Sequence, residues 1–87
     1  MDREKRIQFI KDHGYKNVSV FADAVNEHPS NVHKILKGQQ IPKIQKLFVY
    51  AAALDVDISK VLEMFYPEEM RQYKEARKQR RTHGDNH

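Results

Sequence analysis

The chain has 87 residues and carries 16 Lys and Arg against 12 Asp and Glu, which gives a net charge of +4. A chain of this length forms one small domain without room for a deep catalytic cleft, and its positive charge favours a polyanionic partner. Cysteine is absent, no apolar run reaches the ~20 residues of a membrane span and no signal-peptide core is present, so we expect a cytoplasmic protein without disulfides or a membrane partner.

The first predicted helix spans Arg3–His13 and ends at Gly14. The apolar residues Ile7, Phe9 and Ile10 give this helix one face that can pack on the rest of the domain. Its basic side chains are expected to remain in solvent. These are Arg3, Lys5, Arg6 and Lys11.

Two short helices joined by a tight turn are predicted next. Residues 21–38 read FADAVNEHPSNVHKILKG, with two apolar helical faces separated by an Asn-Glu-His-Pro turn. Asn17 or Ser19 can cap the earlier of these two helices, the second of the chain, because each offers a side-chain acceptor to unpaired amides. The later of the two, the third helix of the chain, is predicted over 29–37, with Pro29 at its first position and a glycine beyond its end. Two helices that cross over a tight turn form a helix-turn-helix, which presents its second helix to the DNA major groove.

A fourth helix is predicted over 43–54 and a fifth after Asp57, whose side chain can cap it. The fourth helix is expected to be the central core helix, because apolar residues nearly encircle it. These residues are Ile44, Leu47, Phe48, Tyr50, Ala51 and Leu54. No segment of the chain favours a strand.

The composition changes after Pro67. Residues 67–81 read PEEMRQYKEARKQRR, with acidic residues first and basic residues last, an order that complements the dipole of a helix. Met70 and Tyr73 form a thin apolar stripe, so this helix is expected to pack either on the domain or against a second copy of the chain. Its basic end can add a phosphate contact, and residues 82–87 are expected to be a disordered tail.

Charge is distributed unevenly along the chain. Between Glu27 and Asp55 there is no Asp or Glu, although nearly a third of the whole chain is charged. The same stretch contains the four lysines Lys34, Lys37, Lys43 and Lys46. A surface with one sign of charge is what phosphate contact requires, whereas a solvated helix pair without a ligand is the alternative interpretation.

These features resemble the lambda-repressor-like, Cro-type (XRE) family of helix-turn-helix proteins, and the resemblance covers residues 3–66. It implies an all-α fold: a compact five-helix bundle over residues 1–66, to which residues 67–81 add a C-terminal helix or basic tail. Asn26 stands where the family has a turn glycine, and Glu27 where it has an apolar residue. The positions that carry the resemblance are Phe21-Ala22, Val25, Val32, Ile35, Gly38 and the stretch 42–62 (PKIQKLFVYAAALDVDISKVL).

The resemblance and the exposed side of helix 29–37 give a set of candidate DNA contacts. Asn31 can pair with adenine and Lys34 can donate to guanine, each worth roughly 1–3 kcal/mol of discrimination. Contacts with base edges are expected from Pro29, Ser30, Asn31, His33 and Lys34. Contacts with phosphates are expected from Asn17, Ser19, Lys37, Gln39, Gln40 and Lys43.

The sequence therefore favours a transcriptional regulator that binds specific sites in double-stranded DNA, such as a repressor of the phage or mobile-element kind. One module makes few base contacts, so we expect a homodimer on an inverted repeat, formed by the fifth helix and the region of Met70 and Tyr73. The alternative is a protein-interaction module on the same fold, either the antitoxin of a toxin–antitoxin pair or an inhibitor of a host enzyme. No catalytic residue, metal site or cofactor is predicted.

Overall fold

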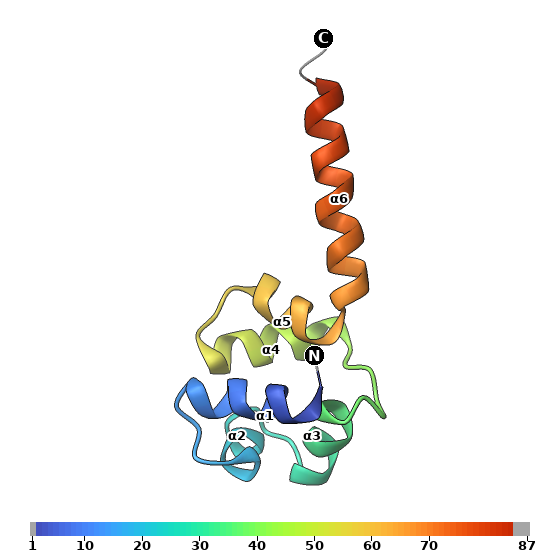
Figure 1. Cartoon of the computed structure of the whole chain (residues 1–87). Coiled ribbons are helices and arrows are strands. Elements are labelled where there is room, and N and C mark those ends of the chain that lie inside the picture. The colour runs from blue at the N-terminus through green and yellow to red at the C-terminus, as the bar shows by residue number, and fades with distance from the viewer. Residues whose placement is uncertain (1, 85–87) are drawn as a thin grey trace.

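The structure of the chain is a computed structural model that describes residues 2–84, with the side chains of residues 2–80. Over this range the chain forms six α-helices and no strand, so the expected all-α class is confirmed (Figure 1). The helices are α1 Arg3–Asp12, α2 Val18–Ala24, α3 Pro29–Leu36, α4 Ile44–Leu54, α5 Ile58–Phe65 and α6 Pro67–Gly84.

The first five helices form a bundle, and α6 extends away from it (Figure 1). The helices α1, α2 and α3 make up one half of the bundle, and α4 and α5 make up the half from which α6 begins. Each of the five contributes buried apolar residues to one core. Tyr50 of α4 belongs to that core, and its ring packs edge-to-face against the rings of Phe21 and Phe65, with centroids 5.0 Å and 6.1 Å away.

Side-chain caps fix where several helices begin. The carboxylate of Asp2 accepts a hydrogen bond from the Lys5 amide at the start of α1. The carboxylate of Asp57 accepts from the Ser59 amide at the start of α5, which confirms the predicted cap. Because these first-turn amides have no partner within the helix, each cap satisfies a group that would otherwise need water.

Arg6 corrects the prediction that the basic residues of the first helix remain in solvent. Its guanidinium donates to the carbonyls of Ile35 and Leu36 at the end of α3, and to the carbonyl of Met64 at the end of α5. It also lies over the ring of Phe65, 4.8 Å from the centroid. A planar cation with several donors suits carbonyls at two helix ends, one of which, that of Ile35, also accepts from the Gly38 amide, so Arg6 joins α1, α3 and α5.

The prediction that apolar residues of α4 are buried all round is wrong for two of them. Leu47, Tyr50, Ala51 and Leu54 are buried, as expected for a core helix. In contrast, Ile44 is 52% exposed and Phe48 is 58% exposed. These two side chains are one helical turn apart and so share a face, and this face is not covered by the rest of the bundle.

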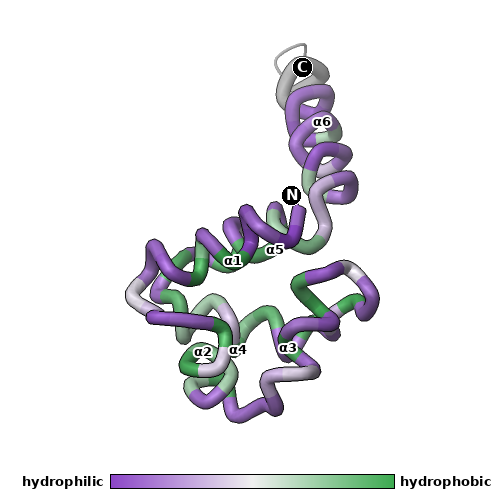
Figure 2. Tube along the Cα trace, turned by 60° about the horizontal axis from the view of Figure 1, so that its bottom comes forward, coloured by the Kyte–Doolittle hydropathy of each residue, from purple (hydrophilic) through white to green (hydrophobic). Residues whose placement is uncertain are grey.

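The first half of α6 contacts the bundle. The Tyr66 hydroxyl donates to the carbonyl of Pro42, and Lys74 forms an ion pair with Glu63 of α5. From Arg71 to Arg80 every residue is exposed, and the helix is mostly hydrophilic along its length (Figure 2). The sequence left open whether this helix packs back on the domain, and in the structure it does not pack along it.

The expected disordered tail differs from the structure over residues 82–84. The helix α6 continues to Gly84, whereas the sequence placed the end of the extension at residue 81. Residues 82–84 are Thr, His and Gly, which are weak helix formers, so they extend a helix that the strong helix formers of residues 76–81 (ARKQRR) establish before them. Residues 85–87 lie outside the described residues.

Candidate nucleic-acid interface

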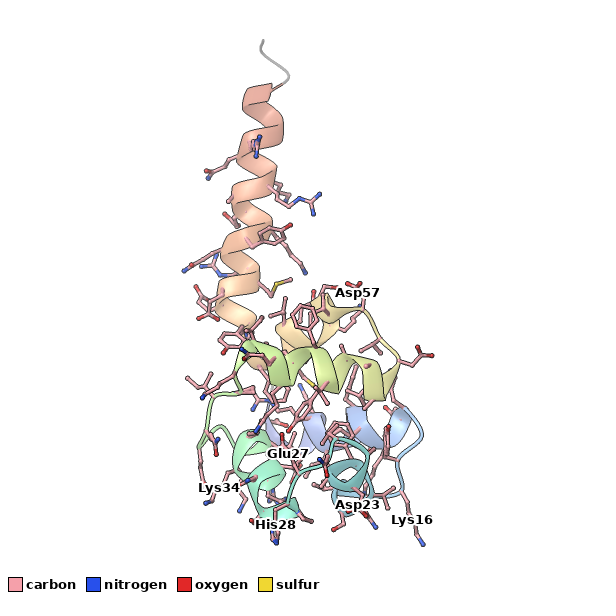
Figure 3. All side chains as sticks on the ribbon, turned by 180° about the vertical axis from the view of Figure 1, so that it is seen from behind. Lys16, Asp23, Glu27, His28, Lys34 and Asp57 are labelled. Atoms are coloured by element: carbon pink, nitrogen blue, oxygen red, sulfur yellow. The ribbon has the colours of Figure 1, made fainter. Side chains whose placement is uncertain are left out.

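The start of α2 is capped by Asn17. Its side-chain oxygen accepts a hydrogen bond from the Val20 amide at 3.0 Å, so Asn17 rather than Ser19 takes the capping position. Both side chains are exposed. The preceding residue, Lys16, is also exposed and lies at the end of the bundle that is remote from α6 (Figure 3).

The connection between α2 and α3 is a tight turn over residues 25–28. Asn26 adopts the left-handed backbone conformation, with φ of +57°. Asparagine tolerates this conformation better than most residues, so it can stand where the family that the sequence resembles has a glycine. The turn is closed by hydrogen bonds from the Asn26 amide to the Asp23 carbonyl and from the Glu27 amide to the Ala22 carbonyl.

The side chain of Glu27 turns toward α4 and not toward solvent (Figure 3). Its Oε1 lies 2.9 Å from Nζ of Lys46, and the side chain is only 12% exposed. Burial raises the pKa of the nearby Tyr50 hydroxyl, and the Glu27 carboxylate raises that pKa further. An ion pair with α4 thus replaces the apolar contact expected at this position, and the negative charge is neutralised within the protein.

The start of α3 is built from His28 and Pro29. Nδ1 of His28 accepts a hydrogen bond from the Ser30 amide at 3.2 Å and lies 2.8 Å from the Ser30 hydroxyl. Pro29 takes the first helical position, as predicted, where its missing N–H leaves no acceptor unpaired. The histidine cap was not foreseen, since His is seldom found at this position.

The helix α3 has a buried side and an outer side. Val32, Ile35 and Leu36 are fully buried and anchor the helix to the core. Among the expected base-contact residues, Ser30, Asn31 and Lys34 are exposed, whereas Pro29 and His33 are partly buried. On a helical projection Ser30, Lys34 and Lys37 lie opposite the buried residues, so they form the outermost strip of the helix. Asn31 and His33 flank this strip on its two sides.

The expected phosphate-contact residues after α3 are exposed. Lys37 caps the helix, and Gly38 follows with φ of +81°, a conformation that favours glycine. The Gln39 amide donates to the Lys34 carbonyl, so the chain stays close to the end of α3. Gln39, Gln40 and Lys43 are all exposed in the connection that leads to α4.

The structure adds three residues to this end of the molecule that the sequence did not assign to it. Lys16 and His28 lie on the side of the bundle that carries Lys34, where the acidic Asp23 is also found (Figure 3). Arg3 of α1 lines a hollow together with residues of α3. A basic residue just before a capped helix is a signal that could have pointed to Lys16. The place of Arg3 depends on how α1 packs against α3.

The opposite half of the molecule carries an apolar groove between α4, α5 and the base of α6. Its apolar lining is Ile44, Leu47, Leu62, Tyr66, Met70 and Tyr73. Tyr73 is 53% exposed, and Phe48 lies on the same face of α4 as Ile44. An exposed apolar surface of this kind is typical of a site that contacts another protein.

Comparison of the chain with models of protein families, with curated proteins and with solved structures finds no match. None of the helices over residues 2–84 combines the length and apolar character that a membrane crossing needs. In the part of the chain that the structure describes, no three His, Asp or Glu side chains are grouped so that they could hold a metal ion.

Proposed function

We propose that this chain is a helix-turn-helix protein of the lambda-repressor-like, Cro type that binds specific sites in double-stranded DNA. The observation that carries the proposal is the two-sided character of α3. Its buried side anchors it to the core, and its outer side presents Ser30, Asn31 and Lys34 to solvent. A helix held in this way can enter the major groove, where amide and ammonium groups pair with base edges.

The charge around α3 supports the same function. No acidic residue follows Glu27 until Asp55, and Glu27 itself is paired with Lys46 inside the bundle. Lys37 and Lys43 are exposed beside α3, where ammonium groups can replace the counterions of DNA phosphates. The proposed role is that of a transcriptional regulator, and a repressor that blocks polymerase by occupying its site is the simplest form.

We further propose that two copies bind an inverted repeat. The apolar groove and the exposed side chain of Phe48 supply a surface that a second copy can cover. In α6, Glu68 and Glu69 lie at the base, and Arg77 and Arg80 lie toward the tip. An antiparallel pair of α6 helices would therefore place opposite charges together. Sedimentation that gives a monomer both free and on a palindromic site would overturn this part of the proposal.

Selection of binding sequences from a random duplex pool tests the function directly. We expect an enriched site with inverted half-sites about one helical turn apart. Affinity for that site should fall steeply as salt is raised, because the contacts with phosphates release counterions. Failure to enrich any sequence, together with salt-independent behaviour, would contradict DNA binding.

The same apolar groove favours a second candidate, a protein-interaction module such as an antitoxin or an enzyme inhibitor. In that case the groove, and not α3, would carry the activity. Substitution of Tyr73 would then abolish binding to the partner, and Lys34→Ala would leave it unchanged. The two functions separate because their surfaces lie on opposite halves of the molecule.

A further inference from the structure

A hollow beside α3 brings cationic side chains from two separate parts of the chain together. It is lined by Arg3, Ser30, His33, Lys34, Lys37 and Gln39, and we call this set the cationic hollow. Arg3 belongs to the first turn of α1, and the other residues belong to α3 and the connection after it. No carboxylate lines the hollow. Three permanent positive charges therefore face one space without an acidic partner.

The three cations of the hollow have no paired group among the described residues, a state that they share with other exposed lysines such as Lys11. Among the described side chains, those of residues 2–80, Arg3, Lys34 and Lys37 form no ion pair and no side-chain hydrogen bond. In contrast, Arg6 binds three backbone carbonyls and Lys74 binds a carboxylate. Like charges that converge without a counter-charge repel one another, and an anion between them would relieve that repulsion.

A further polar group beside the hollow also lacks a partner. Nδ1 of His33 is buried, and no hydrogen bond to it is formed within the described residues. Because buried polar atoms in folded proteins are generally satisfied, an anion that draws the imidazole toward the hollow would give this nitrogen a partner. The side-chain amide of Gln39 can supply a further donor at the edge. This donor set matches the several oxygens of a phosphate.

We propose that the cationic hollow binds one phosphate group through Arg3 and Lys37, beside Lys34 of the base-contacting strip, with Arg3 as a specific phosphate ligand. The identity of that phosphate as part of a DNA backbone rests on the proposed function. The hollow adjoins the outer strip of α3 through Ser30 and Lys34, so a duplex contacted by this strip would bring a flanking phosphate within reach. Arg3 then ties α1 to the same DNA strand and fixes the depth of α3 in the groove.

The experiment compares Arg3→Ala with Lys11→Ala, a matched variant that removes one exposed positive charge from the far end of the same helix. Binding to the selected site and to random duplex is measured over a range of salt concentrations. Arg3→Ala is expected to weaken both by about the same factor, roughly 5- to 10-fold at low salt, and to lower the salt slope by about one. Lys11→Ala is expected to change the affinity far less.

Two further measurements locate the phosphate and separate its possible sources. Single neutral methylphosphonates are placed one at a time along the backbone of the selected site. At one position the substitution should weaken binding of the wild type but should not weaken binding of Arg3→Ala any further. Titration of the free protein with inorganic phosphate, followed by NMR, should shift signals of Arg3, His33 and Lys37. This shift should be lost in Arg3→Ala and retained in Lys11→Ala.

The outcomes are distinct. Phosphate-dependent shifts without any DNA binding would support the hollow as an oxyanion site and contradict the proposed function. A loss of DNA affinity confined to Arg3→Ala would support the hollow with the DNA backbone as its ligand. If Arg3→Ala behaves like Lys11→Ala both on DNA and on inorganic phosphate, the proposal is wrong, whatever becomes of DNA binding.

Discussion

The two halves of this small bundle leave different chemistry exposed. The half that contains α3 presents Ser30, Asn31 and Lys34 to solvent, with further lysines beside them. The half that contains α4 and the base of α6 presents an apolar groove, with Phe48 exposed next to it. A polar cationic surface suits a polyanion and an apolar one suits a protein. On the proposed function, the polar surface would contact DNA and the apolar surface would contact a second copy of the chain.

The largest expected effect concerns the residue that holds the two halves together. Arg6→Ala should lower the free energy of unfolding by about 2–4 kcal/mol, because the carbonyls of Leu36 and Met64 at the ends of α3 and α5 lose this donor. Urea unfolding followed by circular dichroism measures this change. Arg6→Lys should recover only part of the loss, since an ammonium cannot span the same carbonyls. A loss below about 0.5 kcal/mol would show that Arg6 does not join the halves.

The next prediction concerns the polar half. Lys34→Ala should weaken binding to the selected DNA site by about 1–3 kcal/mol, and should weaken binding to random duplex much less. Fluorescence anisotropy with both duplexes measures the difference. Lys60→Ala, which removes an exposed lysine from α5, serves as the matched control. Equal losses on both duplexes would reassign Lys34 from base contact to phosphate contact.

The third prediction concerns the apolar half. Tyr73→Ala and Phe48→Ala should each weaken self-association by about 10-fold or more, because each change removes apolar area from both copies of a symmetric interface. Sedimentation equilibrium measures the dissociation constant. Val20→Ala removes a similarly exposed apolar side chain from α2 and should leave self-association unchanged. If all three variants associate like the wild type, the groove does not form the dimer.

A fourth prediction concerns the ion pair between the α2–α3 turn and α4. Lys46→Met should lower the free energy of unfolding by about 1–2 kcal/mol, because the largely buried carboxylate of Glu27 then lacks its partner. The double variant Glu27→Leu with Lys46→Met should restore most of the stability, since an apolar pair can fill the same space. Thermal unfolding of both variants checks this. A double variant as unstable as Lys46→Met would contradict it.

The smallest expected effect is the pH dependence of the α5 cap. Hydrogen bonds from the Ser59 hydroxyl and amide lower the pKa of Asp57 below its ordinary value of 3.8. Folding therefore favours the ionised carboxylate, whose contribution is complete above that value and is lost as pH falls through the lowered pKa. Asp57→Asn keeps a capping oxygen without the charge. The difference in melting temperature between the wild type and this variant should be constant from pH 7 to 5 and should shrink below about pH 4.

The comparison also shows which features local sequence could predict. The helices follow from apolar periodicity and from caps such as Asn17 and Asp57, because these signals act within a few residues of the chain. The outer side of α3 follows in the same way, since burial of Val32 and Ile35 leaves Ser30 and Lys34 opposite them. The specific family resemblance and the DNA contacts remain predictions.

Other features were decided by contacts between residues far apart in the chain. Sequence periodicity identifies an apolar side of a helix, but it does not show how much of that side another helix covers. Phe48 was therefore expected to be buried, although it is exposed. Arg6 was expected in solvent, but it lies against helix ends that are about 30 and 58 residues away. The place of Arg3 beside α3 has the same origin.

The sequence by itself determined the helical elements, their caps and the polar strip of α3, because each depends on neighbours within one or two helical turns. Only the tertiary structure decided that Glu27 is paired, that Arg6 caps two distant helices and that a groove stays uncovered. These outcomes depend on which surfaces meet across the bundle. Burial and charge pairing are properties of such contacts, and no single segment contains the information for them.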